Sequence, residues 1–353
     1  MLSLHPLKVK TVRELTPDSS VISFEIPRGE EETFRYRQGQ YLSLQVEIDG
    51  EKFKREYSIC SSPYSNEDPA IAVKSSATGT VSKYLRNNIK PGDTILCYPP
   101  NGKFFTELDP ANSKTYILIG GGSGVTPLFS ILKSVLKAEP ESRVILYSGN
   151  STEQSIMFYD DLKSIESENS NLSLLFTLTR PGPEWKGLQG HISEGEIGKL
   201  VTGVNYLERL ECFVCGPNEM MRNSERALLS CGVPADRIHI EYFTPPPVPE
   251  VYMPEGVPDV EDTERRVNII INDEAHTVVV PPGGVILDAA IDADLDPPFS
   301  CRSGICTTCR AKLRSGKVKM DEREGLKDEE IEEGYILTCQ SHPLTDDVTV
   351  EYM

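Results

Sequence analysis

Short stretches of alternating apolar and polar residues dominate the first third of the chain. They cover residues 7–15, 21–26, 41–48, 53–59, 70–75 and 94–98, with turn-forming residues between them. A period of two is typical of strands that bury one face, and six such strands predict a closed antiparallel barrel. One stretch with helical periodicity, residues 81–89, interrupts the strands.

The pattern changes at about residue 114. Apolar strand-like runs at 116–119, 144–147, 172–178, 212–215 and 238–242 are separated by helix-like stretches at 127–137, 153–164, 194–200 and 218–229. Strands that alternate with helices predict a doubly wound parallel sheet with helices on both faces. The second block is therefore expected to be an α/β domain.

A proline-rich stretch separates this block from a third one. Its prolines predict a semi-extended tether. Beyond it, strand-like residues 266–272, 276–280 and 348–352 and helix-like residues 286–293 suit a small β-grasp domain. The expected boundaries are 1–108 for the barrel, 109–243 for the α/β domain, 244–264 for the linker and 265–353 for the last domain.

The composition agrees with two or three domains. The chain has 353 residues, of which 38% are hydrophobic, enough for sizeable cores. Its apolar runs are shorter than the roughly 20 residues of a membrane-spanning helix. The first residues lack the basic and then apolar pattern of an export signal. A cytosolic location is therefore expected.

Negative charge is concentrated in the last domain. Residues 251–353 carry 22 acidic and 10 basic side chains, a net charge of −12 out of −18 for the whole chain. Such a surface disfavours nucleic acid and anionic membranes as partners. It either steers the domain toward a basic patch on an electron acceptor or only keeps the domain soluble.

Four cysteines in the last domain carry the strongest chemical signal. Cys301, Cys306 and Cys309 have four and then two residues between them, and Cys339 follows after 29 intervening residues. Plant-type ferredoxins hold a [2Fe–2S] cluster with this spacing. A zinc site is the first alternative, although zinc sites usually pair two-residue gaps. Disulfides are the second, and nine cysteines without an export signal fit them poorly.

A glycine-rich turn lies between the first strand and the first helix of the α/β block. It comprises Gly120, Gly121, Gly122, Ser123 and Gly124, followed by Val125, Thr126 and Pro127. Glycines let a backbone approach a diphosphate, and a helix N-terminus offers free amides. Thr126 is expected to be the N-cap and Pro127 the first helical residue. The spacing is not that of the Rossmann motif, and no Lys-Ser/Thr pair follows, so an ATP loop is disfavoured.

Two weaker motifs lie in the barrel block. Arg55, Tyr57 and Ser58 end a predicted strand, where an arginine can pair with phosphate and a tyrosine can lie against a flat ring. Residues 79–82 open the helix of this block and offer a second phosphate site. Together the motifs suggest a flavin.

With these motifs in order, the chain resembles the ferredoxin–NADP reductase superfamily with a C-terminal plant-type ferredoxin domain. Within it, the chain is similar to reductase subunits of bacterial oxygenases such as phenylacetyl-CoA epoxygenase. The resemblance covers nearly the whole chain. It implies a β-barrel flavin domain, a parallel-sheet nucleotide domain and a β-grasp ferredoxin domain. It also implies an NAD(P)H-dependent reductase that uses FAD, NADPH and a [2Fe–2S] cluster to serve an oxygenase or hydroxylase.

The resemblance assigns roles to particular residues. Flavin contacts are implied for Arg55, Tyr57, Ser58, Val73, Lys74, Ser75, Gly79, Thr80, Val81 and Ser82. Nucleotide contacts are implied for the turn at 120–124, Thr126, Cys215, Gly216 and Pro217. Glu241 and Phe243 match the end of the reductase module, where an aromatic ring often covers the flavin, and this aromatic favours FAD over FMN. Cys301, Cys306, Cys309 and Cys339 are implied as the cluster ligands.

Two points remain open at the nucleotide. Cys212 and Cys215 form a Cys-x-x-Cys pair that could suggest thiol redox chemistry. We interpret Cys215 as a neighbour of the nicotinamide and Cys212 as a packing residue. Thr179 and Arg180 match residues that hold the 2′-phosphate in NADPH-using relatives, with Lys186 nearby, so NADPH is favoured over NADH.

The implied mechanism passes electrons from NADPH through FAD to the cluster, because a flavin can exchange both two electrons and one. Ser58 and Cys215 would position the reacting groups, and the nicotinamide would displace Phe243. A plant-type cluster at about −400 mV can drive an oxygenase.

The alternative functions are a general reductase for a cytochrome P450 or ring hydroxylase, a cluster-based redox sensor, and a zinc-stabilised structural domain. The five histidines are scattered and are interpreted as structural.

Overall fold

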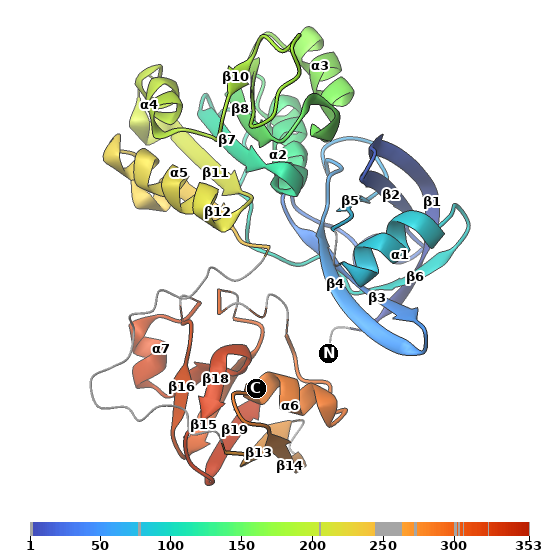
Figure 1. The fold of residues 1–353 in the computed structure, drawn as a ribbon, viewed down its shortest axis with the longest axis vertical. Coiled ribbons are helices and arrows are strands. Elements are labelled where there is room, and N and C mark those ends of the chain that lie inside the picture. The colour runs from blue at the N-terminus through green and yellow to red at the C-terminus, as the bar shows by residue number, and fades with distance from the viewer. Residues whose placement is uncertain are drawn as a thin grey trace. The chain divides into compact units, whose positions relative to one another are not determined.

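A computed structural model describes residues 3–76, 79–204, 206–243, 263–271, 274–299, 302, 304–305, 307–323 and 325–352. The chain divides into two compact units, Met1–Phe243 and Thr244–Met353. Each is described here by itself (Figure 1). Most of the predicted linker lies outside the described residues, and so do Cys301 and Cys306.

The first unit begins with a six-stranded antiparallel sheet. Its strands are β1 (His5–Thr16), β2 (Ser19–Glu25), β3 (Tyr41–Ile48), β4 (Glu51–Ser58), β5 (Ala70–Lys74) and β6 (Thr94–Cys97). The order is β4-β3-β6-β1-β2-β5, and a bridge between Ile59 and Ile71 joins the two edges. This closure is the predicted barrel. The β3–β4 hairpin turns at Asp49 and Gly50, both with positive φ, as a two-residue hairpin turn requires.

Helix α1 (Thr80–Asn88) packs on the barrel through Val81 and Leu85. The side chains inside the barrel come from all the strands, with Leu7, Ile22 and Leu44 fully buried among them. The sequence pattern located the strands, although β2, β3 and β5 are buried at consecutive residues and therefore on both faces.

The second part of this unit is a parallel sheet. Its strands are β7 (Thr115–Gly121), β8 (Arg143–Asn150), β9 (Leu172–Leu178), β10 (Leu188–Gln189), β11 (Leu210–Cys215) and β12 (Ile238–Glu241), in the order β10-β9-β8-β7-β11-β12. The helices are α2 (Val125–Ala138), α3 (Tyr159–Glu168), α4 (Glu194–Thr202) and α5 (Asn218–Ser230). Short 3₁₀ helices are η1 (Gly122–Gly124), η2 (Glu153–Ser155), η3 (Leu207–Arg209) and η4 (Ala235–Arg237).

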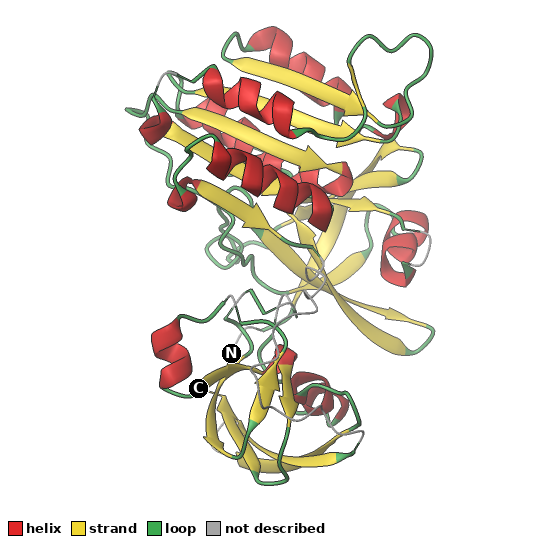
Figure 2. Ribbon diagram, turned by 60° about the vertical axis from the view of Figure 1, so that its left-hand side comes forward, coloured by secondary structure: helices red, strands yellow, loops and turns green. Residues whose placement is uncertain are grey.

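Helices cover both faces of this sheet, as Figures 1 and 2 show. One face packs against α2 and α3, and the other packs against α4 and α5. Strands covered on both sides read as continuous apolar runs, which is why the sequence pattern located them. The doubly wound prediction is confirmed.

The predicted helix at 153–164 is wrong in its extent. The chain forms η2 first, and α3 begins only at Tyr159. Phe158 has φ +61° and interrupts the helical path, and its ring stacks on Phe129 at 4.3 Å between centroids. Burial of Phe158 in the core therefore overrides a helical pattern that is continuous in the sequence.

The barrel and the α/β domain share a hydrophobic core. Cys60, Ala70 and Phe104 of the barrel lie in one cluster with Leu128 of α2 and Phe213 of β11. The rings of Phe104 and Phe213 meet edge to face at 5.3 Å between centroids. The two domains therefore form a single compact unit.

The second unit is the smaller domain. It contains β13 (Arg265–Ile271), β14 (Glu274–Val280), β15 (Arg310–Ser315), β16 (Val318–Met320), β17 (Tyr335–Leu337), β18 (Ser341–Pro343), β19 (Val348–Tyr352), α6 (Ile286–Asp292), α7 (Asp328–Glu332) and η5 (Thr338–Gln340). The main sheet has the order β14-β13-β19-β15-β17, and β16 pairs with β18. β13 and β19 are parallel, and α6 packs on the core, as in the predicted β-grasp fold.

Candidate functional site

Two strands of the parallel sheet end side by side where the strand order reverses. β7 lies between β8 and β11, so the chain continues to one side through β8 and β9 and to the other through β11 and β12. Gly120 of β7 is level with Cys215 of β11. In open α/β sheets, ligands bind outside the carboxyl ends of the strands at such a reversal. The predicted glycine loop, residues 120–124, lies at this point.

The glycine loop packs closely against the segment that follows β11. A Cβ added at Gly124 would lie 2.1 Å from the carbonyl oxygen of Cys215. One added at Gly121 would lie 2.7 Å from Cδ of Pro217, and one at Gly216 would lie 2.9 Å from the amide nitrogen of Gly121. Side chains cannot fit at these distances. The structure thus brings together two of the predicted nucleotide segments and explains their glycines.

The glycine loop also has an open side. Gly122 has φ +54°, and a Cβ there would meet nothing within 4 Å. The N-cap residue of α2 is Gly124, which has no side chain with which to cap the helix. Thr126, in the first turn, is 2% exposed, and its hydroxyl has no hydrogen-bond partner among the described residues. The amide of Val125 donates to carbonyls within the loop. A helix N-terminus and an unpaired buried hydroxyl nevertheless supply donors of the kind that a dinucleotide diphosphate needs, so these residues fit the predicted ligand.

The predicted start of α2 needs correction. Gly124, not Thr126, is the N-cap residue, because η1 runs directly into the helix and Val125 is its first residue. Pro127 is then the third helical residue. The first four N–H groups of a helix have no intrahelical acceptor, so proline costs no hydrogen bond at this position.

Cys212 and Cys215 lie on opposite faces of the sheet. Cys215 belongs to the core beside α2, whereas Cys212 belongs to the core beside α4 and α5. Burial raises the pKa of both thiols, and the charge of Glu241 raises that of Cys215 further. Residues three apart on a strand point in opposite directions. This arrangement disfavours a thiol–disulfide pair, and an uncharged Cys215 is a poor nucleophile.

The end of β12 reaches the same edge of the sheet. Glu241 is level with Cys215 in the parallel register. Phe243, two residues further on, has 46% of its surface exposed. An exposed aromatic side chain at this edge is available to cover a flat ring. Its contact with a flavin stays a prediction.

The two residues predicted to recognise the coenzyme 2′-phosphate follow β9. The amide of Thr179 donates to the carbonyl of Asn150 (3.1 Å), and that of Arg180 donates to the carbonyl of Ser151 (2.8 Å). Arg180 therefore lies beside the end of β8, where the adenosine ribose binds in nucleotide-binding α/β folds. Its side chain is exposed and forms no ion pair with a described residue, and Lys186 is also exposed.

The sequence did not reveal the carboxylate of Glu153, which holds the segment after β9 that contains Arg180. Glu153 accepts hydrogen bonds from the amide of Gly182 with both carboxylate oxygens, at 3.0 and 3.3 Å. The contact spans 29 residues of sequence, and no motif marks it.

The predicted flavin residues of β4 differ in their surroundings. Arg55 is exposed, Tyr57 is half-buried and Ser58 is 7% exposed. Burial raises the pKa of Tyr57 to about 12, and the charge of Arg55 opposes that rise. Arg55 and Tyr57 are two residues apart on β4 and so lie on the same face of the strand, where both could contact one ligand, with the cation available for a phosphate.

The flavin segment of β5 lies alongside that of β4. The bridge between Ile59 and Ile71 closes the barrel and brings the end of β4 next to β5. The hydroxyl oxygen of Ser75 is buried and has no hydrogen-bond partner among the described residues. Such a group needs a ligand or water. Lys74 forms an ion pair with Asp18 at 3.6 Å.

The first turn of α1 completes this group of segments. Gly79 is the N-cap residue and forms no side-chain capping hydrogen bond. Thr80 is exposed and Ser82 is half-buried, whereas Val81 is buried in the barrel core. Val81 can therefore contribute only its backbone to a ligand. The uncapped amides fit the diphosphate of a flavin nucleotide.

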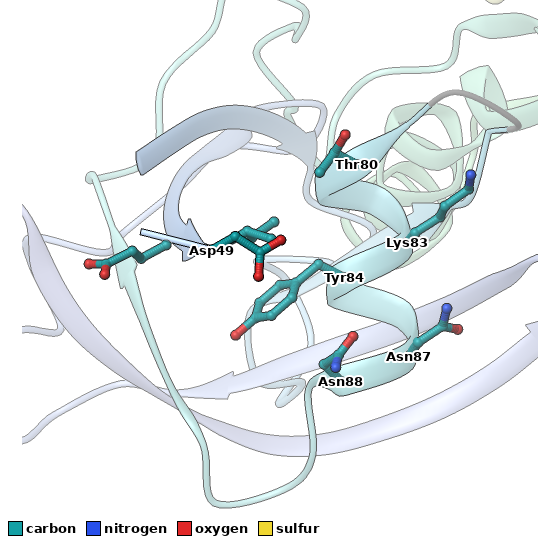
Figure 3. A pocket seen from close by; sticks show the side chains of 8 residues that line it. Asp49, Thr80, Lys83, Tyr84, Asn87 and Asn88 are labelled. Carbon is teal, nitrogen blue, oxygen red and sulfur yellow. The ribbon is translucent and has the colours of Figure 1, made fainter. Parts of the chain in front are cut away.

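A polar pocket lies between α1 and the β3–β4 hairpin (Figure 3). Its volume is 520 Å³, and its lining includes Asp49, Thr80, Lys83, Tyr84 and Asn88. Tyr84 extends from the helix toward the hairpin. Thr80 is the one predicted flavin residue in this lining, so the pocket adjoins the predicted diphosphate site.

In the smaller unit, Cys309 and Cys339 lie together. Their sulfur atoms are 3.3 Å apart, too far for a disulfide at about 2.0 Å. Two thiolates on one tetrahedral metal with bonds of about 2.3 Å are on the order of 3.8 Å apart. Both cysteines are buried with Leu287, Leu326 and Leu337. Soft sulfur ligands in an apolar pocket fit an iron–sulfur cluster.

Two residues outside the predicted set hold the loop between Cys301 and Cys309, the first and third of the predicted cluster ligands. The side-chain nitrogen of Gln340 donates to the carbonyl of Arg302 (2.8 Å), and the amide of Gly325 donates to that of Gly304 (2.7 Å). Gly304 has φ +75°, and its added Cβ would lie 2.6 Å from Cβ of Glu322. Only the position of Gln340 next to Cys339 could have identified it from sequence.

Two histidines, His239 and His342, are held by hydrogen bonds within the fold. His239 hydrogen-bonds one carboxylate oxygen of Glu211 (3.0 Å). The other oxygen of Glu211 pairs with Lys114 and Arg237. Burial alone would raise the pKa of Glu211, but its three cationic or polar partners outweigh burial and lower it to about 2. His342 lies between the carbonyl of Gly284 and the carboxylate of Asp321.

Comparison with known proteins defines the class. Residues 6–106 match the oxidoreductase FAD-binding domain, 118–226 the oxidoreductase NAD-binding domain and 269–344 the 2Fe-2S iron-sulfur cluster binding domain. A relative at 34% identity spans 100% of this chain. The chain belongs to the family of oxygenase reductase components that combine these three domains.

Two relatives match over nearly their whole length. The chain is 34% identical to a subunit of 1,2-phenylacetyl-CoA epoxidase from Escherichia coli, covering 100% of this chain and 98% of that protein. It is 34% identical to the ferredoxin reductase component of 3-ketosteroid-9-alpha-monooxygenase from Mycobacterium tuberculosis, covering 98% and 95%. The solved structure of phthalate dioxygenase reductase covers 99% of this chain and 98% of that one, with a TM-score of 0.66 and 22% identity.

The predicted family, fold class and use of FAD, a pyridine nucleotide and a [2Fe–2S] cluster are thus confirmed. Among the described residues, no helix is long and apolar enough to span a membrane.

Proposed function

We propose that this chain takes electrons from NADPH in preference to NADH and delivers them to an oxygenase of the phenylacetyl-CoA epoxidase type. The full-length similarity to one subunit of that enzyme carries the proposal for the acceptor. The position of Arg180 beside the end of β8 supports the proposal for the coenzyme. The domain boundaries and site residues predicted from sequence are part of the same proposal.

A bound FAD supplies the exchange between the two-electron chemistry of a nicotinamide and the one-electron chemistry of a cluster. Arg55 and the first turn of α1 would hold its diphosphate, with Tyr57 against its ring. Ser58 and the uncharged Cys215 would position the nicotinamide, which enters as Phe243 moves aside. Cys301, Cys306, Cys309 and Cys339 would hold the cluster.

Replacing Arg180 with alanine should raise the KM for NADPH about 10-fold or more and leave the KM for NADH unchanged. A hydrogen bond to a charged group contributes about 1.5–3 kcal/mol, and only NADPH carries the 2′-phosphate. Steady-state ferricyanide reduction with both coenzymes measures this. The exposed Lys137 on α2 provides a control, Lys137→Ala, which should match the wild type. A wild type that prefers NADH, or an equal loss with both coenzymes, would contradict the assignment.

The acceptor is tested by reconstitution. The purified reductase is combined with the oxygenase subunits of E. coli 1,2-phenylacetyl-CoA epoxidase and, separately, with the M. tuberculosis 3-ketosteroid-9-alpha-monooxygenase oxygenase. We expect NADPH-dependent substrate turnover with the first. Turnover with the second alone would replace the proposed acceptor, since the two relatives are equally identical to this chain.

We further propose that the acidic last domain docks on a basic patch of the acceptor. Its net charge of −12 over residues 251–353 supports this. Association steered by exposed charges is screened by salt. Turnover in the reconstituted system should therefore decrease as ionic strength rises, while ferricyanide reduction changes little.

A further inference from the structure

Four buried serines join the barrel to the α/β domain. Ser61 and Ser62 follow β4 in the barrel, and Ser130 and Ser134 lie one turn apart on α2. None of the four is more than 1% exposed. We refer to these residues as the serine seam.

The hydrogen bonds of the serine seam have a defined direction. The Ser130 hydroxyl donates to the backbone carbonyl of Ser61 at 2.6 Å. The Ser134 hydroxyl donates to the carbonyl of Ser130 at 2.7 Å. Since a serine hydroxyl has one hydrogen, the 2.8 Å contact between the Ser62 and Ser134 hydroxyls must have Ser62 as its donor. The bonds therefore cross the interface in both directions, because Ser62 of the barrel donates to α2 and Ser130 of α2 donates back to the barrel.

The barrel side of the serine seam is itself fixed. The hydroxyl of Ser61 lies 2.7 Å from that of Tyr36 and accepts from the amide of Ala70 at 3.0 Å. The hydroxyl of Ser62 also accepts from the amide of Tyr64 at 3.2 Å. These bonds tie the segment after β4 to two other parts of the barrel.

The serine seam lies in a mostly apolar interface, beside an ion pair between Lys133 of α2 and Glu67 of the barrel. Cys60 and Phe104 of the barrel pack there against Leu128 and Ile131 of α2. Apolar contacts are non-directional and tolerate small displacements, whereas buried hydrogen bonds specify one arrangement because an unpaired group is costly. The serines, together with this ion pair at the rim of the interface, therefore fix the register of α2 against the barrel.

This register links the two predicted ligand sites. Ser61 is three residues beyond Ser58, which ends β4 in the flavin segment. Ser130 is six residues beyond Gly124, about 9 Å along α2 from the glycine loop at a rise of about 1.5 Å per residue. The path between the sites consists of a strand end, a buried hydrogen bond and a helix.

We propose that the serine seam positions the nucleotide-binding loop against the flavin site and thereby sets the rate of flavin reduction. The inference rests on the proposed function. In this step two electrons and one proton leave the nicotinamide and reduce the flavin, so the nicotinamide is oxidised. The serines contact neither group and are positioning residues. An error of about 1 Å in such a geometry can cost about 100-fold in rate.

The test is anaerobic stopped-flow reduction of the bound flavin by NADPH in full-length Ser130→Ala and Ser134→Ala. The limiting rate should fall about 10-fold, while the Kd for NADPH changes less than about 2-fold. The long-wavelength charge-transfer absorbance between nicotinamide and flavin should weaken in parallel, which a purely structural role would not produce. Ser130→Cys, which keeps a weak donor of similar size, should recover part of the rate.

Ser224→Ala is the matched control. Ser224 is 0% exposed on α5, and its hydroxyl has no hydrogen-bond partner among the described residues, so wild-type rates are expected. If Ser130→Ala does not fold, Ser62→Ala keeps the Ser130–Ser61 bond and should show a loss of about 3-fold. Wild-type rates and absorbance in the seam variants would overturn the inference alone. Failure of both NADPH and NADH to reduce the wild-type flavin would overturn the proposed function as well.

Discussion

Replacing Cys339 with serine should lower NADPH-dependent cytochrome c reduction at least about 100-fold and leave ferricyanide reduction within about 2-fold of the wild type. The sulfur of Cys339 lies 3.3 Å from that of Cys309 in a buried apolar site. A serine hydroxyl is a hard, weakly acidic ligand in place of a soft thiolate. The cluster should be lost or unstable, while the flavin unit, which folds around its own cores, continues to accept electrons.

Cys231→Ser is the control for this experiment. Cys231 is a free, half-buried cysteine that follows α5 in the first unit, so both activities should be unchanged. Iron content and the visible spectrum should separate the two variants. Equal loss of cytochrome c and ferricyanide reduction in Cys339→Ser would contradict the relay order, because it would make the cluster necessary for the flavin reaction.

Replacing Gly124 with alanine should reduce NADPH-dependent ferricyanide reduction about 100-fold. The new Cβ would lie 2.1 Å from the carbonyl oxygen and 2.4 Å from the carbonyl carbon of Cys215. Both are backbone atoms and cannot rotate away, so the glycine loop or the end of β11 must shift. A displacement of about 1 Å is enough for a loss of this size.

Gly195→Ala is the control for the glycine loop. Gly195 lies in α4, and a Cβ there would meet nothing within 4 Å, so activity should be retained and alanine should suit the helix better. Flavin content and the thermal unfolding temperature of Gly124→Ala show whether the loss is local. Wild-type activity in Gly124→Ala would show that this close approach does not govern nucleotide binding.

Strands with buried faces were predictable from the sequence. β9 was expected at 172–178 and is found at Leu172–Leu178, because five of its seven residues are apolar, as packing of helices on both faces of a sheet favours. β15 and β16 were missed, since Lys312, Arg314 and Lys319 break the apolar pattern. β15 is defined by its pairing with β19, and β16 by its pairing with β18. These partner strands lie further along the chain, so a local sequence pattern does not reveal the pairing.

In the candidate sites, too, some features could be predicted from the sequence and others could not. Gly120 and Cys215 could be predicted from motifs because close backbone approach admits few residue types. The contacts between motifs could not. Ser61 and Ser130 are 69 residues apart, and the sequence does not distinguish them from ordinary surface serines. Only the fold shows that they are hydrogen-bonded. The N-cap of α2 was misplaced because the 3₁₀ turn before the helix has no sequence signature.

The central claim is that one chain carries electrons from a pyridine nucleotide through a flavin to a [2Fe–2S] cluster. Its most direct test is anaerobic reduction of the purified, reconstituted protein by NADPH, followed by absorbance and by low-temperature electron paramagnetic resonance. The account predicts bleaching of the flavin together with the signal of a reduced [2Fe–2S] cluster, and bleaching without that signal in Cys339→Ser. A wild-type protein that contains zinc in place of iron, or whose cluster stays oxidised after the flavin is bleached, would contradict it.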